Sequence, residues 1–223
     1  MTDDPLTELI LVRHGESDVN VQRVLGGEVS CTGLSDLGRR QATALRERWE
    51  AGDAPAADVL YSSPLPRARE TAEIINPALG DLPIKIEQDL EELRPGQADG
   101  MTFAEMQEQF GPFEYRSRPD KSMVLDVETR LTFFYRTSRA LEKVVADNVG
   151  KTVVIACHGG VIDVAFRHLL DVAPQGMFDL WTINTSLTEF RVQDADDKRG
   201  RWMLVRYNDH AHLSGLPAET ATA

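Results

Sequence analysis

Two kinds of hydrophobic pattern alternate along most of this chain. Short runs with the pattern of strands occur at Glu8–Val12, Asp58–Tyr61, Ile84–Glu87 and Thr152–Cys157. Apolar residues at helical spacing predict amphipathic helices at Asp36–Ala51, Arg67–Ile75, Thr102–Phe110, Asp126–Ala146 and Gly160–Leu170. Strands that alternate with helices are typical of a parallel sheet covered on both faces. We therefore expect an α/β fold: a three-layer α/β/α sandwich around a mostly parallel central sheet.

The last part of the chain predicts a different kind of strand pair. Leu187–Val192 and Arg201–Tyr207 flank the polar segment Asp194–Gly200, which indicates an antiparallel hairpin at or near an edge of the sheet. A length of 223 residues suits one large domain or two small ones, and no repeat or low-complexity linker divides the sequence. We expect a single domain over residues 1–223.

Residues 94–121 form the least regular part of the chain. Proline and glycine interrupt all but one short helical stretch, so we expect a lid-like excursion over a site. Its aromatic residues would pack on an organic leaving group and its basic residues would bind a second anion, although an ordinary packed cap with solvated charges fits equally well. The residues concerned are Phe103, Phe110, Phe113, Tyr115, Arg94, Arg116, Arg118 and Lys121.

Composition and charge disfavour two classes of partner. The chain has 24 Lys and Arg against 36 Asp and Glu, a net charge of −12, and no long basic run, so we expect no nucleic-acid partner. No apolar run approaches the ~20 residues that span a bilayer, so we expect no membrane partner. The acidic N-terminus does not resemble a secretory signal, and Cys31 and Cys157 do not make a disulfide framework. A cytoplasmic location is expected.

Charged and imidazole side chains follow three of the predicted strands. Arg13 and His14 come directly after the first strand, Arg67 lies just beyond the second, and His158 comes directly after Thr152–Cys157. Binding sites in open α/β sheets lie outside the carboxyl ends of the strands, so these side chains should converge. We expect a local positive pocket, for which phosphate is the natural ligand.

Glycine follows both histidines. A single histidine at a strand end is more often structural, but His14-Gly15 and His158-Gly159 repeat the arrangement and favour a functional interpretation. Gly159 and Gly160 would also allow close approach of backbone N–H groups to an anion near a helix start.

Specific motifs carry a family resemblance. Leu11–Ser17 resembles the signature of the histidine phosphatase superfamily, the phosphoglycerate-mutase-like proteins. Further segments similar to that family follow in the family's order: Asn20, Leu34–Ala42, Ser62–Ala68, Thr71-Ala72, His158–Ile162 and Asn208–Leu213. The resemblance therefore covers nearly the whole chain.

The resemblance implies roles for individual residues. His14 resembles the nucleophile that becomes phosphorylated, while Arg13, Arg67 and His158 resemble the phosphate-binding pocket. We expect a neutral His14, a protonated His158, and chemistry that requires neither a metal nor another cofactor.

A carboxylate and two polar residues complete the implied site. Glu92 resembles the proton donor because it keeps the family's spacing to the glycines that follow, with Glu91 as its rival; both could also be solvated loop carboxylates. Ser17 and Asn20 resemble secondary phosphate contacts, and roles as turn or cap residues are about equally consistent with the sequence.

The favoured function is a metal-independent phosphomonoester hydrolase that acts on a small phosphorylated substrate. A phosphoglycerate-type phosphomutase is one alternative, but the segment after Glu92 does not resemble the basic stretch typical of mutases. A catalytically idle phospholigand-binding module is another. A zinc site at Cys157-His158 and His210-x-His212 is weakly indicated. Ala98-Asp99, Gly33 and Cys31 depart from the family pattern, which leaves the substrate open, and a homodimer is compatible with the sequence.

Overall fold

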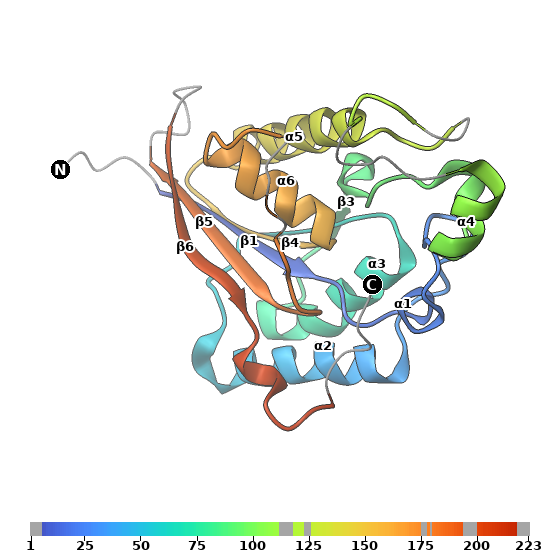
Figure 1. Ribbon diagram of the computed structural model, residues 1–223. Helices are drawn as coiled ribbons and strands as arrows, with labels where there is room; N and C mark the ends of the chain where they lie inside the picture. The colour runs from blue at the N-terminus through green and yellow to red at the C-terminus, as the bar shows by residue number, and fades with distance from the viewer. Residues whose placement is uncertain are drawn as a thin grey trace.

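A six-stranded sheet forms the centre of the protein (Figure 1). The computed structural model describes residues 6–111, 118–122, 126–174, 178, 180–193 and 200–217. The strand order is β3-β2-β4-β1-β5-β6, in which the first four strands are parallel and β5 runs antiparallel to both β1 and β6. The strands are β1 (Thr7–Arg13), β2 (Val59–Ser62), β3 (Ile84–Ile86), β4 (Thr152–Cys157), β5 (Leu187–Gln193) and β6 (Arg201–Asp209).

The central strands bury both faces of the sheet. Successive side chains of a strand point to opposite faces, so Leu9 and Leu11 of β1 join one apolar core while Ile10 and Val12 join the other. Full burial of one such side chain contributes about 1.5–3 kcal/mol. The mostly apolar sequence of β1 is therefore what a strand between two helical layers requires.

Helices cover the two faces in pairs. Figure 1 shows α5 (Arg130–Ala146) and α6 (Gly159–Leu169) on one side of the sheet and α2 (Asp36–Arg48) and α3 (Pro66–Ile75) on the other. This arrangement confirms the predicted three-layer α/β/α sandwich with a mostly parallel sheet. The predicted antiparallel hairpin is also confirmed, because β5 and β6 pair and β6 is the edge strand.

Helix ends differ from the sequence predictions where capping decides them. The prediction that α5 begins at Asp126 is wrong: the hydroxyl of Thr129 accepts the N–H of Thr132, so the helix begins at Arg130. The prediction that α2 reaches Ala51 is also wrong. The chain forms a wider π turn at Trp49–Asp53, which keeps Trp49 buried in the core.

Two short helices lie near the carboxyl ends of the strands. The sequence did not predict α1 (Asp18–Gln22), because so short a helix shows no hydrophobic period. The predicted α4 (Phe103–Phe110) is present and begins with a capping box between Thr102 and Glu105. In the described part of the chain, no helix is long and apolar enough to cross a membrane.

Candidate active site

Strand register brings the two predicted histidines together. Arg13 pairs with Cys157 across β1 and β4, so His14 and His158 leave neighbouring strands at the same level. Their rings lie edge to face with centroids 5.1 Å apart. Arg67 comes from the first turn of α3, which follows β2, and its Nε lies 3.1 Å from Nε2 of His14. The predicted convergence of strand ends is therefore observed.

Hydrogen bonds select one tautomer of His14. Its Nδ1 lies 2.7 Å from the carbonyl oxygen of Gly15, which can only accept, so Nδ1 carries the proton. Nε2 accepts the Nε–H of Arg67 over 3.1 Å, so it carries the lone pair of the ring rather than a proton. Burial, followed by the charges of Arg67 and Arg13, holds the pKa of His14 well below its usual value. The His14 ring is therefore neutral, as the mechanism inferred from sequence expects.

The expectation of a protonated His158 refers to the pocket with a phosphoryl group bound, whereas the ligand-free structure favours a neutral ring. Burial, followed by the charge of Arg67, holds the pKa of His158 well below its usual value, so its ring is neutral as well. Its Nε2 lies 2.7 Å from the hydroxyl of Ser63, and its buried Nδ1 has no hydrogen-bond partner among the described residues.

These neutral histidines predict that the fold loses stability in mild acid. The pKa values of His14 and His158 are lowered in the folded protein, and burial together with the charge of Arg48 lowers that of His212 to about 4. The unfolded chain therefore takes up protons that the folded one does not. The contribution of these neutral rings to the free energy of unfolding is fully present above about pH 6.5 and is lost progressively below it. For each such histidine the loss approaches about 1.4 kcal/mol per pH unit.

Urea unfolding at pH 7.5, 6.5 and 5.5 measures this dependence. We expect the free energy of unfolding to fall over this range, and the fall to become shallower in His14→Asn and in His158→Asn. An unchanged pH dependence in both variants would show that these rings are protonated in the folded protein.

Two arginines supply the positive charge of the pocket. Arg13 donates from Nη1 to the carbonyl oxygen of Thr182, and Arg67 donates from Nη1 to that of Gly26 over 3.1 Å. Both side chains are buried. A guanidinium group anchored to a carbonyl at one end still presents further N–H donors in a fixed plane, a geometry that suits phosphoryl oxygens.

The two rival carboxylates lie in different surroundings. Glu92 extends into the cavity that contains His14, and its Oε2 accepts the backbone N–H of Gly160 over 2.9 Å at the start of α6. Its Oε1 accepts the N–H of Leu93 over 2.9 Å. Glu91 instead forms an ion pair with Arg94 over 2.7 Å and does not line that cavity. The geometry therefore favours Glu92 as the residue that can reach a substrate.

Gly160 is required for this placement of Glu92. A Cβ at position 160 would lie 2.1 Å from Oε1 of Glu92, whereas a Cβ at Gly159 would meet Oγ1 of Thr182 at 3.4 Å, an ordinary contact. Alanine also favours a helix more than glycine does. We expect Gly160→Ala to lower kcat by about 10-fold or more without lowering the melting temperature, and Gly159→Ala to have a smaller effect on kcat.

Enzyme assays and thermal unfolding of both variants check this expectation. If Gly160→Ala kept full activity, the position of the Glu92 carboxylate would have no catalytic importance.

The other predicted substrate contacts separate into two groups. Asn20 and Gly159 line the cavity. Ser17 is fully buried, and both its hydroxyl and its backbone N–H lie within hydrogen-bond distance of Oδ1 of Asn20, at 2.7 and 3.1 Å. Ser17 thus stabilises the start of α1, and this geometry gives no support to a substrate contact by Ser17.

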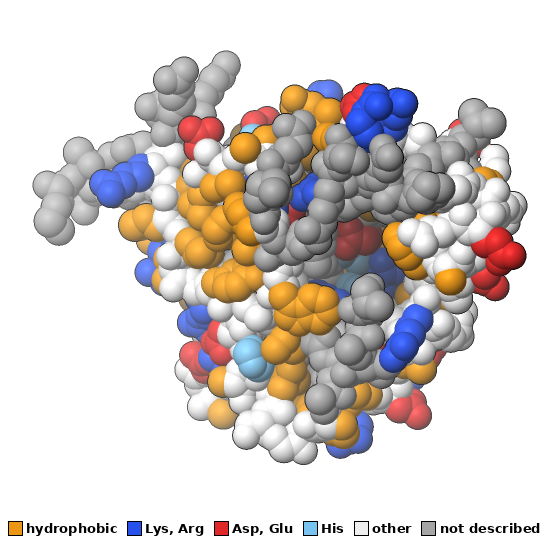
Figure 2. All heavy atoms as spheres, viewed as in Figure 1, with side chains coloured by type: hydrophobic (Ala, Val, Ile, Leu, Met, Phe, Trp, Pro, Cys, Tyr) orange, Lys and Arg blue, Asp and Glu red, His pale blue; other side chains and the backbone are white. Residues whose placement is uncertain are grey.

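The cavity has a charged end and an apolar wall. Its volume is about 330 Å³, and Figure 2 shows a hollow in which acidic, basic and imidazole side chains meet. Arg13, His14, Arg67 and Glu92 lie at the charged end. The apolar wall consists of Val19, Val24, Leu25, Leu93, Pro95, Ala98, Phe103, Met106 and Val127.

The lid prediction is tested only for its described residues. Phe103 of α4 lines the cavity, as expected for a lid, whereas Phe110 does not. Arg94 pairs with Glu91, and Arg118 lies 3.4 Å from Asp120, so neither extends into the cavity. Of the other residues in this prediction, Lys121 does not line the cavity, and Phe113, Tyr115 and Arg116 lie outside the described residues.

Sequence reasoning missed the polar segment before β5. The side-chain amide of Asn184 donates to the carbonyl oxygen of His14 over 2.8 Å, and the N–H of Thr185 donates to that of Arg13 over 2.9 Å. Both residues are buried although they are polar. Their run of small polar residues directly before a strand was the available signal, since such residues often fix backbone groups near a site.

Asp99 also has a role that the sequence did not reveal. Its carboxylate accepts the N–H groups of Gly27 and Val29 over 2.9 and 2.8 Å and also contacts Ser30. Burial alone would raise the pKa of Asp99, but these hydrogen bonds together lower it. The loop that Asp99 holds also contains Gly26, whose carbonyl oxygen binds Arg67. This departure from the family pattern therefore supports the arginine indirectly.

The weakly indicated zinc site has no geometric support. The described residues contain no group of three or more His, Cys, Asp and Glu side chains that could hold a metal ion. Cys157 packs in the apolar core on the α5–α6 face, where burial raises the pKa of its thiol. Nε2 of His212 lies 2.9 Å from the hydroxyl of Thr185.

Comparison with known proteins points to one family. A family model described as "Histidine phosphatase superfamily (branch 1)" matches residues 9–210. The chain is 33% identical over 213 residues to the "Uncharacterized phosphatase PhoE" of Bacillus subtilis, a match that covers 95% of this chain and 99% of that protein. It is 27% identical over 223 residues to the "Metal-independent phosphoserine phosphatase" of Arabidopsis thaliana, covering 96% and 86%.

A solved structure shows the same fold. "Bacillus stearothermophilus YhfR" superimposes with a TM-score of 0.79 at 28% identity, over 93% of this chain and 99% of that one. The likeness therefore extends over nearly the whole α/β fold.

Proposed function

Because this chain belongs to the histidine phosphatase superfamily (branch 1), we propose that it hydrolyses small phosphomonoesters by transient phosphorylation of His14. One observation carries the assignment of His14: its unprotonated Nε2 lies in a buried pocket, where it accepts a hydrogen bond from Arg67, the arginine that would bind the phosphoryl group. Glu92 lines the same cavity, where it can serve the leaving oxygen. The chemistry needs a nucleophile, anion binding and a proton donor, and these residues supply all three.

In the first step, Nε2 of His14 attacks phosphorus in line, and the bond from phosphorus to the leaving oxygen breaks. The carboxyl proton of Glu92 passes to that oxygen, so the leaving group departs as a neutral alcohol. The Nε–H of Arg67 leaves Nε2 of His14 and binds a non-bridging phosphoryl oxygen, which frees the lone pair for the attack. Arg13 and Arg67 then stabilise the charge on those oxygens. Nδ1 of His14 keeps its proton and donates it in a hydrogen bond to the carbonyl oxygen of Gly15. This bond fixes the ring during the attack.

In the second step, water attacks the phosphohistidine and Glu92, now ionised, takes its proton. The bond from Nε2 to phosphorus breaks, and inorganic phosphate leaves. The same carboxylate therefore acts first as acid and then as base, which is why its position above the nucleophile matters in both steps.

In the free protein the neutral ring of His158 packs against that of His14, fully buried and outside the lining of the cavity. Its buried Nδ1 has no partner among the described residues, which supports the proposal that a substrate oxygen supplies one. A bound phosphoryl group brings negative charge, so we expect the pKa of His158 to rise on binding and its ring to become a donor to that oxygen.

Trapping the covalent intermediate tests the proposed function. Brief incubation with a ³²P-labelled phosphomonoester in the presence of EDTA, followed by denaturation, should leave an acid-labile, alkali-stable label on the protein. Release of inorganic phosphate in step with consumption of the ester would distinguish a phosphatase from a mutase. A folded protein that binds phosphate but acquires no label would support the idle binding module instead.

The apolar wall predicts which leaving groups are accepted. The described lining offers no cationic side chain beyond Arg13 and Arg67, which serve the phosphoryl group. We expect kcat/KM for phenyl phosphate to exceed that for 4-carboxyphenyl phosphate by about 10-fold, since an unpaired carboxylate against apolar side chains loses hydration.

Parallel kinetics with the two esters checks this preference. A preference for the carboxylated ester would assign a second anion site to the lid, and Arg116→Ala would then abolish that preference.

Location and assembly remain predictions. Both Cys31 and Cys157 are buried free thiols, which supports a reducing compartment and hence a cytoplasmic protein. A homodimer is compatible with the sequence, and light scattering of the purified protein would measure its mass.

A further inference from the structure

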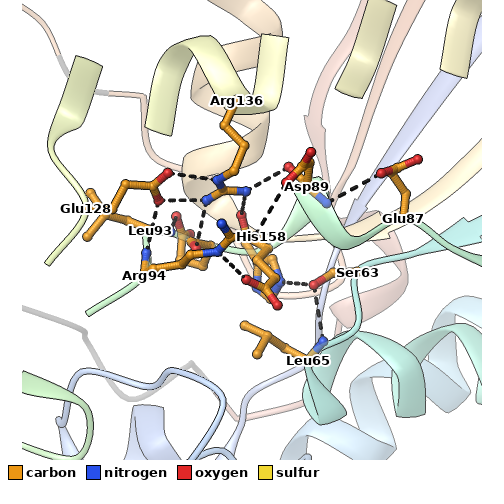
Figure 3. Close-up of polar contacts among 11 residues, drawn as sticks. Ser63, Leu65, Glu87, Asp89, Leu93, Arg94, Glu128, Arg136 and His158 are labelled. Carbon is orange, nitrogen blue, oxygen red and sulfur yellow. Dashed lines mark hydrogen bonds and ion pairs between the residues drawn. The ribbon is translucent and has the colours of Figure 1, made fainter. Parts of the chain in front are cut away.

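The loop that carries Glu92 is fastened to α5. This loop, residues 87–94, follows β3 and contains one turn of 3-10 helix at Gln88–Leu90. Figure 3 shows Arg136 of α5 reaching into it between Glu128 and Asp89. The side chain of Arg136 is only 10% exposed although it is charged, so its partners must compensate the loss of hydration.

Arg136 binds three main-chain carbonyl groups of the loop. Its Nη1 donates to the carbonyl oxygens of Asp89 and Glu91, over 2.8 and 3.3 Å, and its Nη2 donates to that of Glu92 over 3.3 Å. The planar guanidinium group therefore fixes the backbone on both sides of the residue that the proposed mechanism uses as acid and base.

Glu128 holds the guanidinium group in this plane. Nε and Nη2 of Arg136 donate to the two carboxylate oxygens of Glu128, over 2.8 and 2.7 Å. The same carboxylate accepts the N–H of Arg94 over 3.2 Å, and the N–H of Glu128 donates to the carbonyl oxygen of Arg94 over 2.9 Å. Arg136 and Glu128 together thus hold the loop from Asp89 to Arg94.

The Glu92 side chain is fixed at both of its ends, the carboxylate and the backbone. Gly160 N–H binds its Oε2, while Arg136 fixes the backbone from which the side chain extends. Neither Arg136 nor Glu128 lines the cavity. We propose that Arg136, oriented by Glu128, is a positioning residue that sets the Glu92 carboxyl for proton transfer to the leaving group. This inference rests on the proposed function of Glu92.

Lys143 provides a matched control on the same helix and the same loop. Its Nζ binds Oε2 of Glu87 over 2.7 Å, so it also joins α5 to the loop. Its partner is the side chain of Glu87 rather than the Glu92 backbone, and the Lys143 side chain is exposed. Lys143→Met therefore removes one attachment of the loop while the Arg136 contacts stay in place.

Two esters with the same ring separate positioning from general loss of structure. 4-Nitrophenyl phosphate releases a stable phenolate that needs little protonation, whereas 2-(4-nitrophenyl)ethyl phosphate releases an alkoxide that needs a proton donor. We expect Arg136→Met to lower kcat/KM for the alkyl ester by about 10- to 100-fold and for the aryl ester by no more than about 3-fold. Arg136→Lys should recover part of the alkyl activity, and Lys143→Met should change neither value by more than about 2-fold.

A double-mutant cycle tests whether Arg136 acts through Glu92. In the Glu92→Gln background, Arg136→Met should lower kcat/KM for the alkyl ester by less than about 3-fold further, because the donor is already absent. Three outcomes would each overturn the inference. Arg136→Met could lower kcat/KM equally for both esters, or it could cause its full loss again in the Glu92→Gln background. Alternatively, Glu92→Gln alone could lower kcat/KM equally for both esters. Failure of the proposed function appears separately, as absence of a trapped phosphohistidine in the wild-type protein.

Discussion

Replacing His14 with alanine is expected to abolish turnover. The variant lacks the nitrogen that forms the bond to phosphorus in the proposed mechanism, so we expect kcat to fall by about 10⁴-fold or more and the ³²P label to disappear. Arg13 and Arg67 are anchored to the carbonyl oxygens of Thr182 and Gly26, so they should remain in place. Binding of inorganic phosphate should therefore persist, which calorimetry can measure.

A histidine outside the cavity provides the control. His168 on α6 pairs with Glu142 over 3.0 Å and does not line the cavity, so His168→Ala should keep activity within about 3-fold of wild type. Retention of more than a few per cent of activity by His14→Ala, after exclusion of contaminating phosphatase, would contradict the assignment of the nucleophile.

The second large effect is expected at Glu92. Glu92→Gln keeps the size of the side chain but removes its acid and base functions, so kcat/KM for an alkyl phosphate should fall by about 10²- to 10⁴-fold. Loss of the base also slows hydrolysis of the intermediate. With 4-nitrophenyl phosphate we therefore expect a burst of nitrophenol followed by slow turnover, and stopped-flow absorbance would detect it.

Glu91→Gln is the matched comparison, because it makes the same substitution one residue earlier. Glu91 pairs with Arg94, whose side chain is 47% exposed, and an ion pair of this kind contributes little. We expect less than about 3-fold loss of activity. The reverse ranking of the two variants would identify Glu91 as the proton donor.

The fold could be predicted largely from the sequence because its signals are local. Buried strands such as Thr152–Cys157 show mostly apolar runs. A charged or imidazole side chain marks the end of the run, as His158 does here. The positions of Arg13, Arg67 and His158 followed from one topological rule, the position of sites at the carboxyl ends of parallel strands. Strand order was not needed, because all the parallel strands end at the same edge.

The remaining features depend on contacts between distant residues. Arg136 looks like any charged residue of an amphipathic helix, and only the folded chain shows that it binds the main chain of the loop that carries Glu92. Asp99 likewise reads as a solvated loop residue until its hydrogen bonds to Gly27 and Val29 are seen. The neutral state of His158 in the ligand-free protein could not be predicted, because the depth of its burial is not visible in a sequence.

The cavity joins the central layers of the fold to a short helix outside them, and we expect these two parts to differ in local unfolding free energy. His14 and His158 adjoin β1 and β4, whose backbones are paired on both sides and whose faces are both covered. The apolar wall includes Phe103 and Met106 of α4, a two-turn helix outside the central layers. Transient opening of α4 would therefore admit and release substrate while the phosphate-binding centre keeps its geometry. Substitutions in that wall can change the accepted alcohol without the stability loss that changes in the central strands would cause.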